Sequence, residues 1–129
     1  MNVVLDTNVL VSVLWSADSK PYAIVSSVLN HTFTLCYDYR ILEEYVTVLH
    51  RPKFLFSENE INVLINGMTK NGISIIPNRS PNVPFTDESD RKFYEVAKFC
   101  NAKLITGNIK HFPKDSCVMT VSEFIKTYL

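Results

Sequence analysis

The alternation of two kinds of apolar pattern constrains the fold of this chain more than any other feature. Short runs rich in β-branched residues are typical of buried strands, and apolar residues recurring every three or four positions are typical of helices. Because the two kinds alternate, the sequence predicts right-handed βαβ units and a mostly parallel sheet covered on both faces. We expect strands at Asn2–Asp6, Thr32–Tyr37, Gly72–Ile76, Lys103–Thr106 and Cys117–Val121.

Predicted helices occupy most of the sequence between these strands. The first follows the opening strand directly, with an apolar stripe that starts at Val9. Ser57 is a natural N-cap for a later helix. The prolines of the segment Pro77–Phe85 predict an irregular surface connection and not a domain boundary. Further helical patterns cover Ala23–Leu29, Tyr39–His50, Glu58–Lys70, Asp87–Cys100 and Val121–Tyr128.

Length and composition suit one globular domain. The chain has 129 residues, of which 47% are hydrophobic, and we expect a single domain over residues 1–129. No apolar run approaches the roughly 18 residues of a membrane span. The first predicted strand is preceded by no cationic segment, so a signal peptide is not indicated. We therefore expect a cytoplasmic protein with no membrane association.

The three cysteines, Cys36, Cys100 and Cys117, are far apart in the sequence. They form no CxxC pair, so the sequence indicates neither a zinc site nor a disulfide framework. We expect each to be a small buried hydrophobic residue.

The formal net charge is zero, which argues against a strong general affinity for nucleic acid. The charge is unevenly distributed, however. The segment from Arg91 to Lys114 contains six lysines and arginines and one acid, Glu95. A solvated surface is the simpler explanation, and a phosphate-contacting face is the alternative.

Asp6 lies at the carboxyl end of the first predicted strand, between two apolar runs. Its side chain could cap the following helix, but Thr7 and Asn8 could cap the same helix, and we assign the cap to one of these two. In open parallel sheets, ligands bind outside the carboxyl ends of the strands. Thr106 and Asn108 supply neutral oxygens at the end of another predicted strand, although Gly-Asn is also ordinary turn chemistry.

Two further acids lie beside the apolar stripes of their predicted helices, Glu44 on the flank and Asp90 nearer the buried face. At about 100° per residue, Glu44 lies roughly 115–120° from the centre of its apolar stripe and Glu43 roughly 140–145°. Asp90 lies only about 60° from the centre of its own stripe, where a carboxylate is costly unless it is paired or binds a metal. Asp87 lies one turn earlier. Attraction of acids to a helix N-terminus explains Asp87 but not the orientation of Asp90.

These positions predict that Asp6, Glu44, Asp90 and Asn108 converge at one edge of the sheet. Such a set of oxygen ligands suits Mg²⁺ or Mn²⁺. A divalent ion relieves the repulsion between clustered carboxylates, and it can activate water and stabilise the attacking and leaving oxygens of a phosphodiester. The residues therefore favour phosphodiester hydrolysis.

Four motifs occur in order along the chain: DTNVLVS at Asp6–Ser12, EEYVTVLHRPKF at Glu43–Phe54, DESDRKFYEVA at Asp87–Ala97 and LITGNIKHF at Leu104–Phe112. Together they resemble the PIN-domain family, in its branch of toxins from toxin–antitoxin systems related to VapC. The resemblance implies a three-layer α/β/α sandwich with a mostly parallel central sheet of four to five strands. It also implies an acidic pocket that binds Mg²⁺ or Mn²⁺ and a metal-dependent endoribonuclease activity.

The resemblance also assigns site residues. Asp6, Glu44 and Asp90 match the family's catalytic and metal-binding acids, and Asp87 is an auxiliary metal ligand. The fourth family position, commonly Asp or Asn, is Asn108 in this chain. Because Asn brings no charge, we expect one tightly bound metal and a second recruited only with the substrate phosphate. Asn8 and Thr106 match recurrent polar neighbours of the pocket, where Thr106 and Asn108 would orient water or phosphate.

Three residues at the end of the last motif and just beyond it, Lys110, His111 and Lys114, could contact the RNA backbone. His111 could protonate the leaving group, although we favour the simpler interpretation of an unpaired surface histidine. The family resemblance implies a small cognate antitoxin protein as partner. Family members often form homodimers, for which the apolar residues Phe54–Phe56 could serve.

Two other functions compete with a toxin endoribonuclease. The first is a non-catalytic PIN-fold module with a weakened metal site that binds RNA or protein, which the neutral net charge and Asn108 favour. The second is a phospho-acceptor α/β domain. That design usually places a lysine at the end of a later strand, whereas Lys103 begins its strand, so we rank it last.

Overall fold

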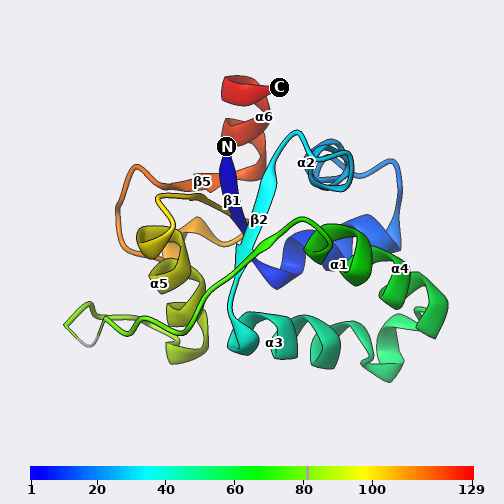
Figure 1. Ribbon diagram of the computed structural model, residues 1–129, viewed down its shortest axis with the longest axis horizontal. Helices are drawn as coiled ribbons and strands as arrows, with labels where there is room; N and C mark the ends of the chain where they lie inside the picture. The colour runs from blue at the N-terminus through cyan, green and yellow to red at the C-terminus, as the bar shows by residue number, and fades with distance from the viewer. Residues whose placement is uncertain (81) are drawn as a thin grey trace.

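A computed structural model describes residues 1–80 and 82–129 as an α/β fold around a five-stranded sheet (Figure 1). Every strand pair is parallel, and the strand order is β3-β2-β1-β4-β5. Because the chain builds one side of β1 and then the other, the order reverses between β1 and β4, where open sheets bind ligands. The strands are β1 (Asn2–Leu5), β2 (Thr34–Tyr37), β3 (Ile73–Ser74), β4 (Lys103–Thr106) and β5 (Val118–Thr120).

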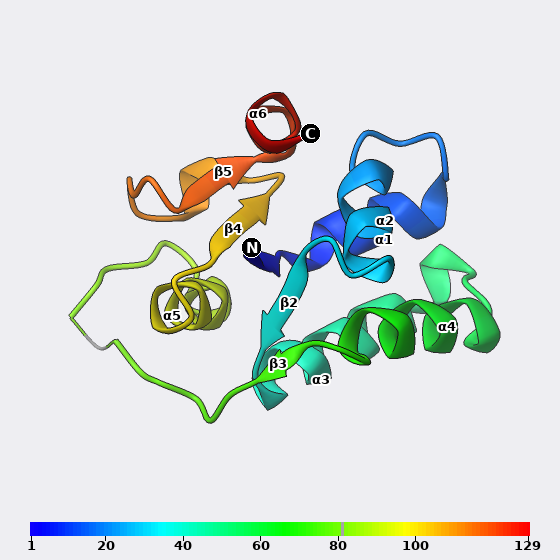
Figure 2. The ribbon, with the colours of Figure 1, turned by 45° about the horizontal axis from the view of Figure 1, so that its top comes forward.

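Helices cover both faces of this sheet. Figure 2 shows α5 on one side and α1, α2 and α6 on the other, which confirms the predicted three-layer arrangement. None of the helices in the described part of the chain is both long and apolar enough to cross a membrane. The helices are α1 (Thr7–Trp15), α2 (Tyr22–Leu29), α3 (Tyr39–Leu49), α4 (Glu58–Thr69), α5 (Arg91–Phe99) and α6 (Val121–Tyr128), with single 3₁₀ turns η1 (Pro52–Phe54), η2 (Glu88–Asp90) and η3 (Ile109–His111).

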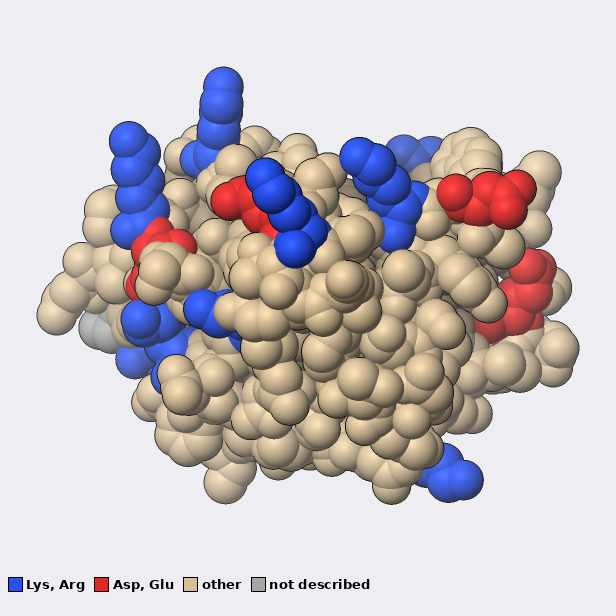
Figure 3. Space-filling model, turned by 90° about the horizontal axis from the view of Figure 1, so that it is seen from above, with Lys and Arg blue, Asp and Glu red and all other residues tan. Residues whose placement is uncertain are grey.

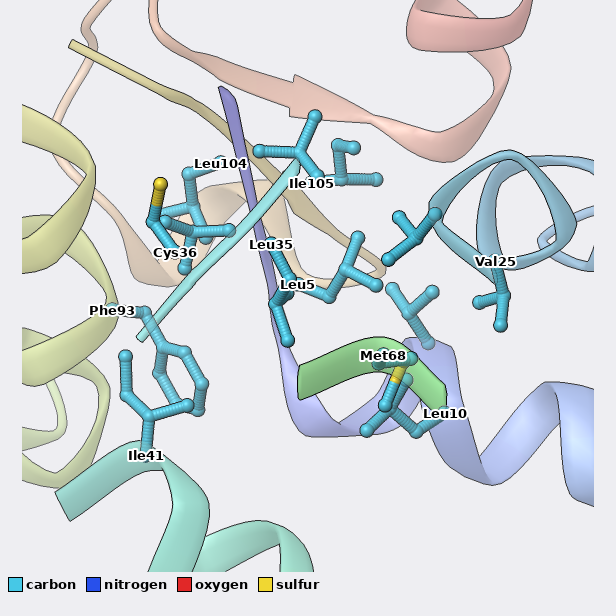
Figure 4. Packing of buried hydrophobic residues seen from close by; sticks show 14 of the residues in the cluster. Leu5, Leu10, Val25, Leu35, Cys36, Ile41, Met68, Phe93, Leu104 and Ile105 are labelled. Atoms are coloured by element: carbon cyan, nitrogen blue, oxygen red, sulfur yellow. The ribbon is translucent and has the colours of Figure 1, made fainter. Parts of the chain in front are cut away.

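The central strands are buried on both faces, which explains why they are apolar without alternation. Leu5 and Ile105 are paired in register and face the α1 and α2 side (Figure 4). Leu104 and Cys36 point to the opposite side, toward Phe93 of α5 (Figure 4). All five of these side chains are fully buried, so the core continues through the sheet from one helical layer to the other.

The three cysteines are free thiols in different surroundings. Cys36 is buried in the core, whereas Cys100 and Cys117 are only half-buried. The prediction of a buried hydrophobic role is therefore confirmed for Cys36. It holds only in part for the other two, which pack against the core but lie next to turns and stay half-buried.

Local capping explains where several helices begin. Ser57 caps α4 as predicted, in a capping box with Glu60. The helix predicted from Asp87 begins only at Arg91, because the preceding turn is the 3₁₀ turn η2. The Asp87 side chain accepts a hydrogen bond from the Ser89 N–H at 2.9 Å, which fixes this tighter turn.

The connection from β3 to η2 is irregular. The predicted loop Pro77–Phe85 contains no helix or strand in its described part, and its Pro81 lies outside the described residues. The loop is nevertheless anchored, because the Ser80 hydroxyl donates to Glu95 Oε2 at 3.0 Å and the Ser80 N–H donates to the same oxygen. Arg91 donates in turn to the Ser80 carbonyl.

A buried ionic network connects this loop to α3 and α5. Arg40 pairs with Asp38 at 2.7 Å and with Glu95 at 2.9 Å, and neither carboxylate has exposed side-chain surface. Asp38 also caps α3, accepting from the Arg40 and Ile41 backbone N–H groups at 2.9 and 3.2 Å. The sequence did not indicate this network, because its members come from three separate elements.

We expect Arg40→Met to lower the free energy of unfolding at pH 7 by about 3–5 kcal/mol, since it leaves Asp38 and Glu95 buried without their cation. Urea denaturation measures the change. The exposed Lys126→Met is the control and should change stability by less than about 0.5 kcal/mol. A loss below about 1 kcal/mol for Arg40→Met would show that these ion pairs do not stabilise the fold.

Candidate functional site

An acidic pocket of about 280 Å³ lies at the carboxyl ends of β1 and β4. In Figure 1 this is the lower end of the sheet, where β1 and β2 lead into α1 and α3. The position is the point of strand-order reversal described above, so the topology itself brings the two strand ends together. The pocket is lined by Asp6, Thr7, Asn8, Glu44, Val48, Arg51, Asp87, Ser89, Asp90, Asn108 and His111.

Asp6 is held rigidly at the end of β1. Its backbone N–H donates to the Ile105 carbonyl at 3.0 Å, which extends the pairing of β1 with β4. Its Oδ2 accepts from the hydroxyl of the fully buried Thr106 at 2.7 Å, and that hydroxyl accepts from the Asn108 N–H at 2.9 Å. Asp6 occupies the N-cap position of α1 but makes no side-chain cap hydrogen bond.

The predicted cap role of Thr7 or Asn8 is wrong. The helix α1 begins at Thr7 itself, so both residues lie inside its first turn. The Thr7 hydroxyl donates across the pocket to Glu44 Oε2 instead of to the helix backbone. Long-range contact with another helix therefore replaces the local capping interaction.

The surroundings of Asp6 disfavour the charged form of its carboxyl group. Its pKa is raised to about 6, chiefly by burial and also by the nearby charges of Asp90 and Glu44. The hydrogen bond from Thr106 lowers the pKa but does not offset the burial. The hydroxyl of the fully buried Tyr45 donates to the Leu5 carbonyl at 2.5 Å. This hydroxyl therefore does not donate to the Asp6 carboxylate.

Glu44 reaches the pocket from α3. Its Oε1 lies 2.8 Å from Lys92 Nζ, and its side chain is 24% exposed. Glu43 is exposed and does not line the pocket. The helical angles calculated from the sequence thus predicted correctly that Glu44, and not Glu43, lines the acidic pocket.

Asp90 is the acid with the fewest partners. It ends η2, and its buried Oδ2 has no hydrogen-bond partner in the described part of the chain. His111 Nδ1 lies 3.5 Å from this oxygen, a distance that allows electrostatic attraction but is too long for a good hydrogen bond. Burial, and then the charge of Asp87, raises the pKa of Asp90.

Asp87 is exposed at the rim of the pocket. It accepts hydrogen bonds from the Ser89 N–H and hydroxyl at 2.9 and 2.8 Å, and these bonds lower its pKa. Its carboxylate is therefore stabilised locally, in contrast to that of Asp90.

The residues after β4 are divided between two places. Asn108 and His111 line the acidic pocket, and Thr106 lies behind Asp6. Lys110 and Lys114 instead border a separate, mainly apolar hollow with Phe112 and Val118. Of the three residues expected to contact RNA, only His111 is thus at the pocket, and its side chain is 49% exposed.

The carboxylates share one pocket but do not form a metal cluster. Within residues 1–80 and 82–129, no three His, Cys, Asp or Glu side chains are gathered in a way that could hold a metal ion. Mutual repulsion explains this, because Glu44 turns to Lys92 and Thr7, and Asp87 turns to Ser89. The donor set still fits a hard divalent cation, since its members are oxygens and Asp90 Oδ2 is buried without a donor.

Two cations beside the acids, Arg51 and Lys92, were not predicted as site residues. Both lie within motifs that carried the family resemblance, but nothing in their local spacing marks them. Arg51 lines the pocket because the chain turns after α3. Lys92 reaches Glu44 because α5 packs against α3.

Comparison with known proteins adds three findings. A sequence profile described as a PIN domain matches residues 2–110. An uncharacterised protein of Methanocaldococcus jannaschii is 32% identical over 111 residues, which cover 84% of this chain and 71% of that protein. The crystal structure of VapBC2 from Rickettsia felis, bound to a DNA fragment from their promoter, matches with a TM-score of 0.60 at 16% identity, over 93% of this chain and 97% of that chain. At such low identity the structural match shows a shared fold.

In metal-free protein, we expect Asp6→Asn to raise the free energy of unfolding at pH 8 by about 1–3 kcal/mol. The raised pKa of Asp6 means that wild-type stability is lost as the pH rises from about 4 to about 6. The amide removes that loss and keeps an oxygen for the Thr106 hydroxyl, so the two proteins should converge at pH 4.

Urea denaturation in EDTA at pH 4, 6 and 8 measures this difference. The control is Asp87→Asn, which should not gain stability at pH 8, because the pKa of Asp87 is lowered in the folded protein. An Asp6→Asn variant no more stable than wild type at pH 8 contradicts the prediction.

Proposed function

The chain belongs to the PIN-domain family, as its four motifs predicted, and on that premise we propose that it is a divalent-metal-dependent endoribonuclease. One observation carries the proposal: Asp90 Oδ2 is buried in an acidic pocket without a hydrogen-bond partner in the described part of the chain. A buried carboxylate oxygen in this state is costly unless a cation satisfies it.

In this proposal Asp6, Glu44 and Asp90 hold Mg²⁺ or Mn²⁺, with Asp87 as an auxiliary ligand at the rim. When bound, such an ion lowers the pKa of a water molecule and neutralises charge on the scissile phosphate of RNA. Asn108 brings an oxygen without charge, which favours one tightly bound ion over two.

The neighbours of these acids act as positioning residues. Thr106 fixes Asp6 through its hydroxyl and connects Asp6 to the backbone of Asn108. Thr7 and Lys92 hold the two oxygens of Glu44. These contacts restrict the carboxylates to narrow orientations, and a preorganised site loses less freedom when it binds its ion and substrate.

His111 is the candidate for proton transfer to the leaving oxygen. An imidazole can gain or lose a proton near neutral pH, and this one lies at the pocket beside Asp90. Asn8 and Asn108 line the same pocket and supply neutral polar groups that can orient a phosphate or water.

The biological role within this proposal is that of a cytoplasmic toxin with a small antitoxin partner. The fold shared with the Rickettsia felis VapBC2 structure supports it. The antitoxin would cover the acidic pocket or a neighbouring groove. A gene for a small DNA-binding protein next to the gene for this chain would support the role, and inhibition of RNA cleavage by that protein would test it.

An exposed aromatic cluster is the candidate contact for a homodimer. Trp15 is 66% exposed and Leu55 88% exposed, and the rings of Phe54 and Phe56 stack beside Trp15 with their centroids 5.4 Å apart. Contiguous exposed apolar groups of this kind mark protein contacts more often than chance.

A non-catalytic PIN-fold module that binds RNA or protein is the second candidate. It is favoured by the dispersed arrangement of the carboxylates in the described residues and by the uncharged Asn108. Calorimetric titration with Mn²⁺ distinguishes the nuclease from the non-catalytic module. Absence of Mn²⁺ binding at millimolar concentration supports the non-catalytic module.

Cleavage of a labelled RNA in the presence of Mg²⁺ or Mn²⁺ tests the main proposal. We expect Asp6→Asn, Glu44→Gln and Asp90→Asn each to lower the rate by about 10²-fold or more, since each removes a charge that holds the ion. EDTA should abolish cleavage. The matched control is Asp18→Asn, an exposed acid far from the pocket lining, which should cleave as wild type does. A triple variant of the three acids that cleaves as fast as wild type rules out the proposal.

A further inference from the structure

A second, larger hollow of about 600 Å³ adjoins the acidic pocket. The two share part of their walls, including Glu44, Val48, Arg51 and Ser89, so they are continuous. The wall of this second hollow contains five arginines and lysines against three glutamates, whereas the acidic pocket has four carboxylates against one arginine. We call it the basic hollow; it is lined by Tyr39, Arg40, Glu43, Glu44, Thr47, Val48, Arg51, Arg79, Glu88, Ser89, Arg91 and Lys92.

The charged hollows lie around the carboxyl ends of the strands. Figure 3 shows the molecule from the other end, above the amino ends, where uncharged residues cover most of the surface and the charged side chains lie in the upper half of the view and at its sides. Although the net charge of the chain is zero, the two adjoining hollows at the carboxyl ends carry opposite charges side by side. This arrangement suits a polyanion such as RNA. One of its phosphates would bind a metal ion in the acidic pocket, and the neighbouring phosphates would bind arginines or lysines in the basic hollow.

Not all the cations of the basic hollow are available to a ligand. Arg40 is bound to Asp38 and Glu95. Arg91 pairs with Glu88 at 2.6 Å and Lys92 with Glu44 at 2.8 Å.

Arg51 and Arg79 remain. Both are exposed, and neither forms an ion pair within the described residues. Arg51 borders both hollows, whereas Arg79 lines the basic hollow away from the acids. Arg51 therefore stands where the basic hollow meets the acidic pocket, and Arg79 stands on the part of the basic hollow that the acidic pocket does not share.

Hydrogen bonds hold the backbone at or next to both arginines. Arg79 precedes Ser80, which is anchored to Glu95 and Arg91 by three hydrogen bonds. Arg51 follows α3, and its N–H donates to the Val48 carbonyl at 3.1 Å. These bonds restrict the backbone at both arginines, which lowers the entropy lost on binding.

Tyr39 adds an aromatic surface to the basic hollow. It is the first residue of α3 and is 60% exposed. Exposed aromatic rings beside cations are the usual platform for unpaired bases, because every base can stack on them. A paired base in a duplex cannot reach such a ring.

We propose that the basic hollow holds the nucleotides on one side of the scissile phosphate of a single-stranded RNA, with Arg51 and Arg79 binding successive backbone phosphates and Tyr39 stacking on a base. This inference rests on the proposed nuclease function, since it takes the acidic pocket as the position of the scissile phosphate. It assigns to Arg51, Arg79 and Tyr39 roles in substrate positioning that no motif indicated.

Binding of a fluorescein-labelled single-stranded 12-nucleotide RNA in EDTA, followed by anisotropy, tests the two arginines without cleavage. We expect Arg51→Gln and Arg79→Gln each to weaken binding about 3- to 10-fold at low salt. Each should also reduce the slope of log affinity against log salt by about 0.7, the value for one phosphate contact on a single strand. The control Lys126→Gln, on α6, should change neither quantity. Arginine variants that bind as this control does overturn the proposal, as does a wild type that does not bind the RNA.

Tyr39 is tested by a pair of variants. Tyr39→Leu should weaken binding of the single strand about 5-fold or more, since it removes the stacking surface, and Tyr39→Phe should keep wild-type affinity. A duplex RNA of the same sequence should bind more weakly than the single strand and be insensitive to Tyr39→Leu. Equal losses for Leu and Phe, or an equal loss on the duplex, overturn the stacking role.

The outcome separates this inference from the proposed function. If wild type cleaves RNA with metal but the Arg51 and Arg79 variants bind and cleave as wild type does, the basic hollow is not the substrate path and the nuclease proposal stands. If wild type never cleaves but these variants lose RNA binding, the hollow binds RNA and the nuclease proposal fails.

Discussion

The pair of salt bridges made by the half-buried Arg40 is the interaction on which the rest of the site depends. It joins Asp38, where β2 passes into α3, to Glu95 on α5, and Glu95 also anchors the loop at Ser80. These three segments supply most of the wall of the basic hollow, and α3 also lines the acidic pocket. Two carboxylates without exposed surface are tolerated because one cation and several N–H and O–H donors satisfy them together. The walls are thus fixed relative to one another before any ligand arrives.

The acidic pocket shows the opposite electrostatic condition. Burial and mutual repulsion raise the pKa of both Asp6 and Asp90, so the folded protein keeps these charges at the expense of stability. Residues that destabilise the fold while sharing a pocket are typical of functional sites. The adjoining basic hollow has the complementary charge, which the zero net charge of the chain conceals. Local distribution, and not total charge, decides what this end of the molecule can bind.

Much of the fold follows from short-range pattern. The strands and most helices were predicted within a few residues, because buried parallel strands are short apolar runs and amphipathic helices repeat every three or four residues. The errors lie where local signals compete. Thr7 has the chemistry of a helix cap, yet its hydroxyl bonds Glu44 on another helix. The turn before Arg91 is 3₁₀ and not α-helical, because Asp87 bonds the backbone two residues on.

The sequence by itself determined that Asp6 follows the central strand, that Glu44 and not Glu43 turns toward the pocket, and that Asp90 is partly buried. Each of these follows from a periodicity within one element. Only the tertiary structure decided which cations stand beside those acids, that Asp38 and Glu95 share Arg40, and that Arg51 borders two hollows of opposite charge. The physical reason is that ion pairs and pocket walls join residues from different elements, and no periodicity along one element specifies the distance between two of them.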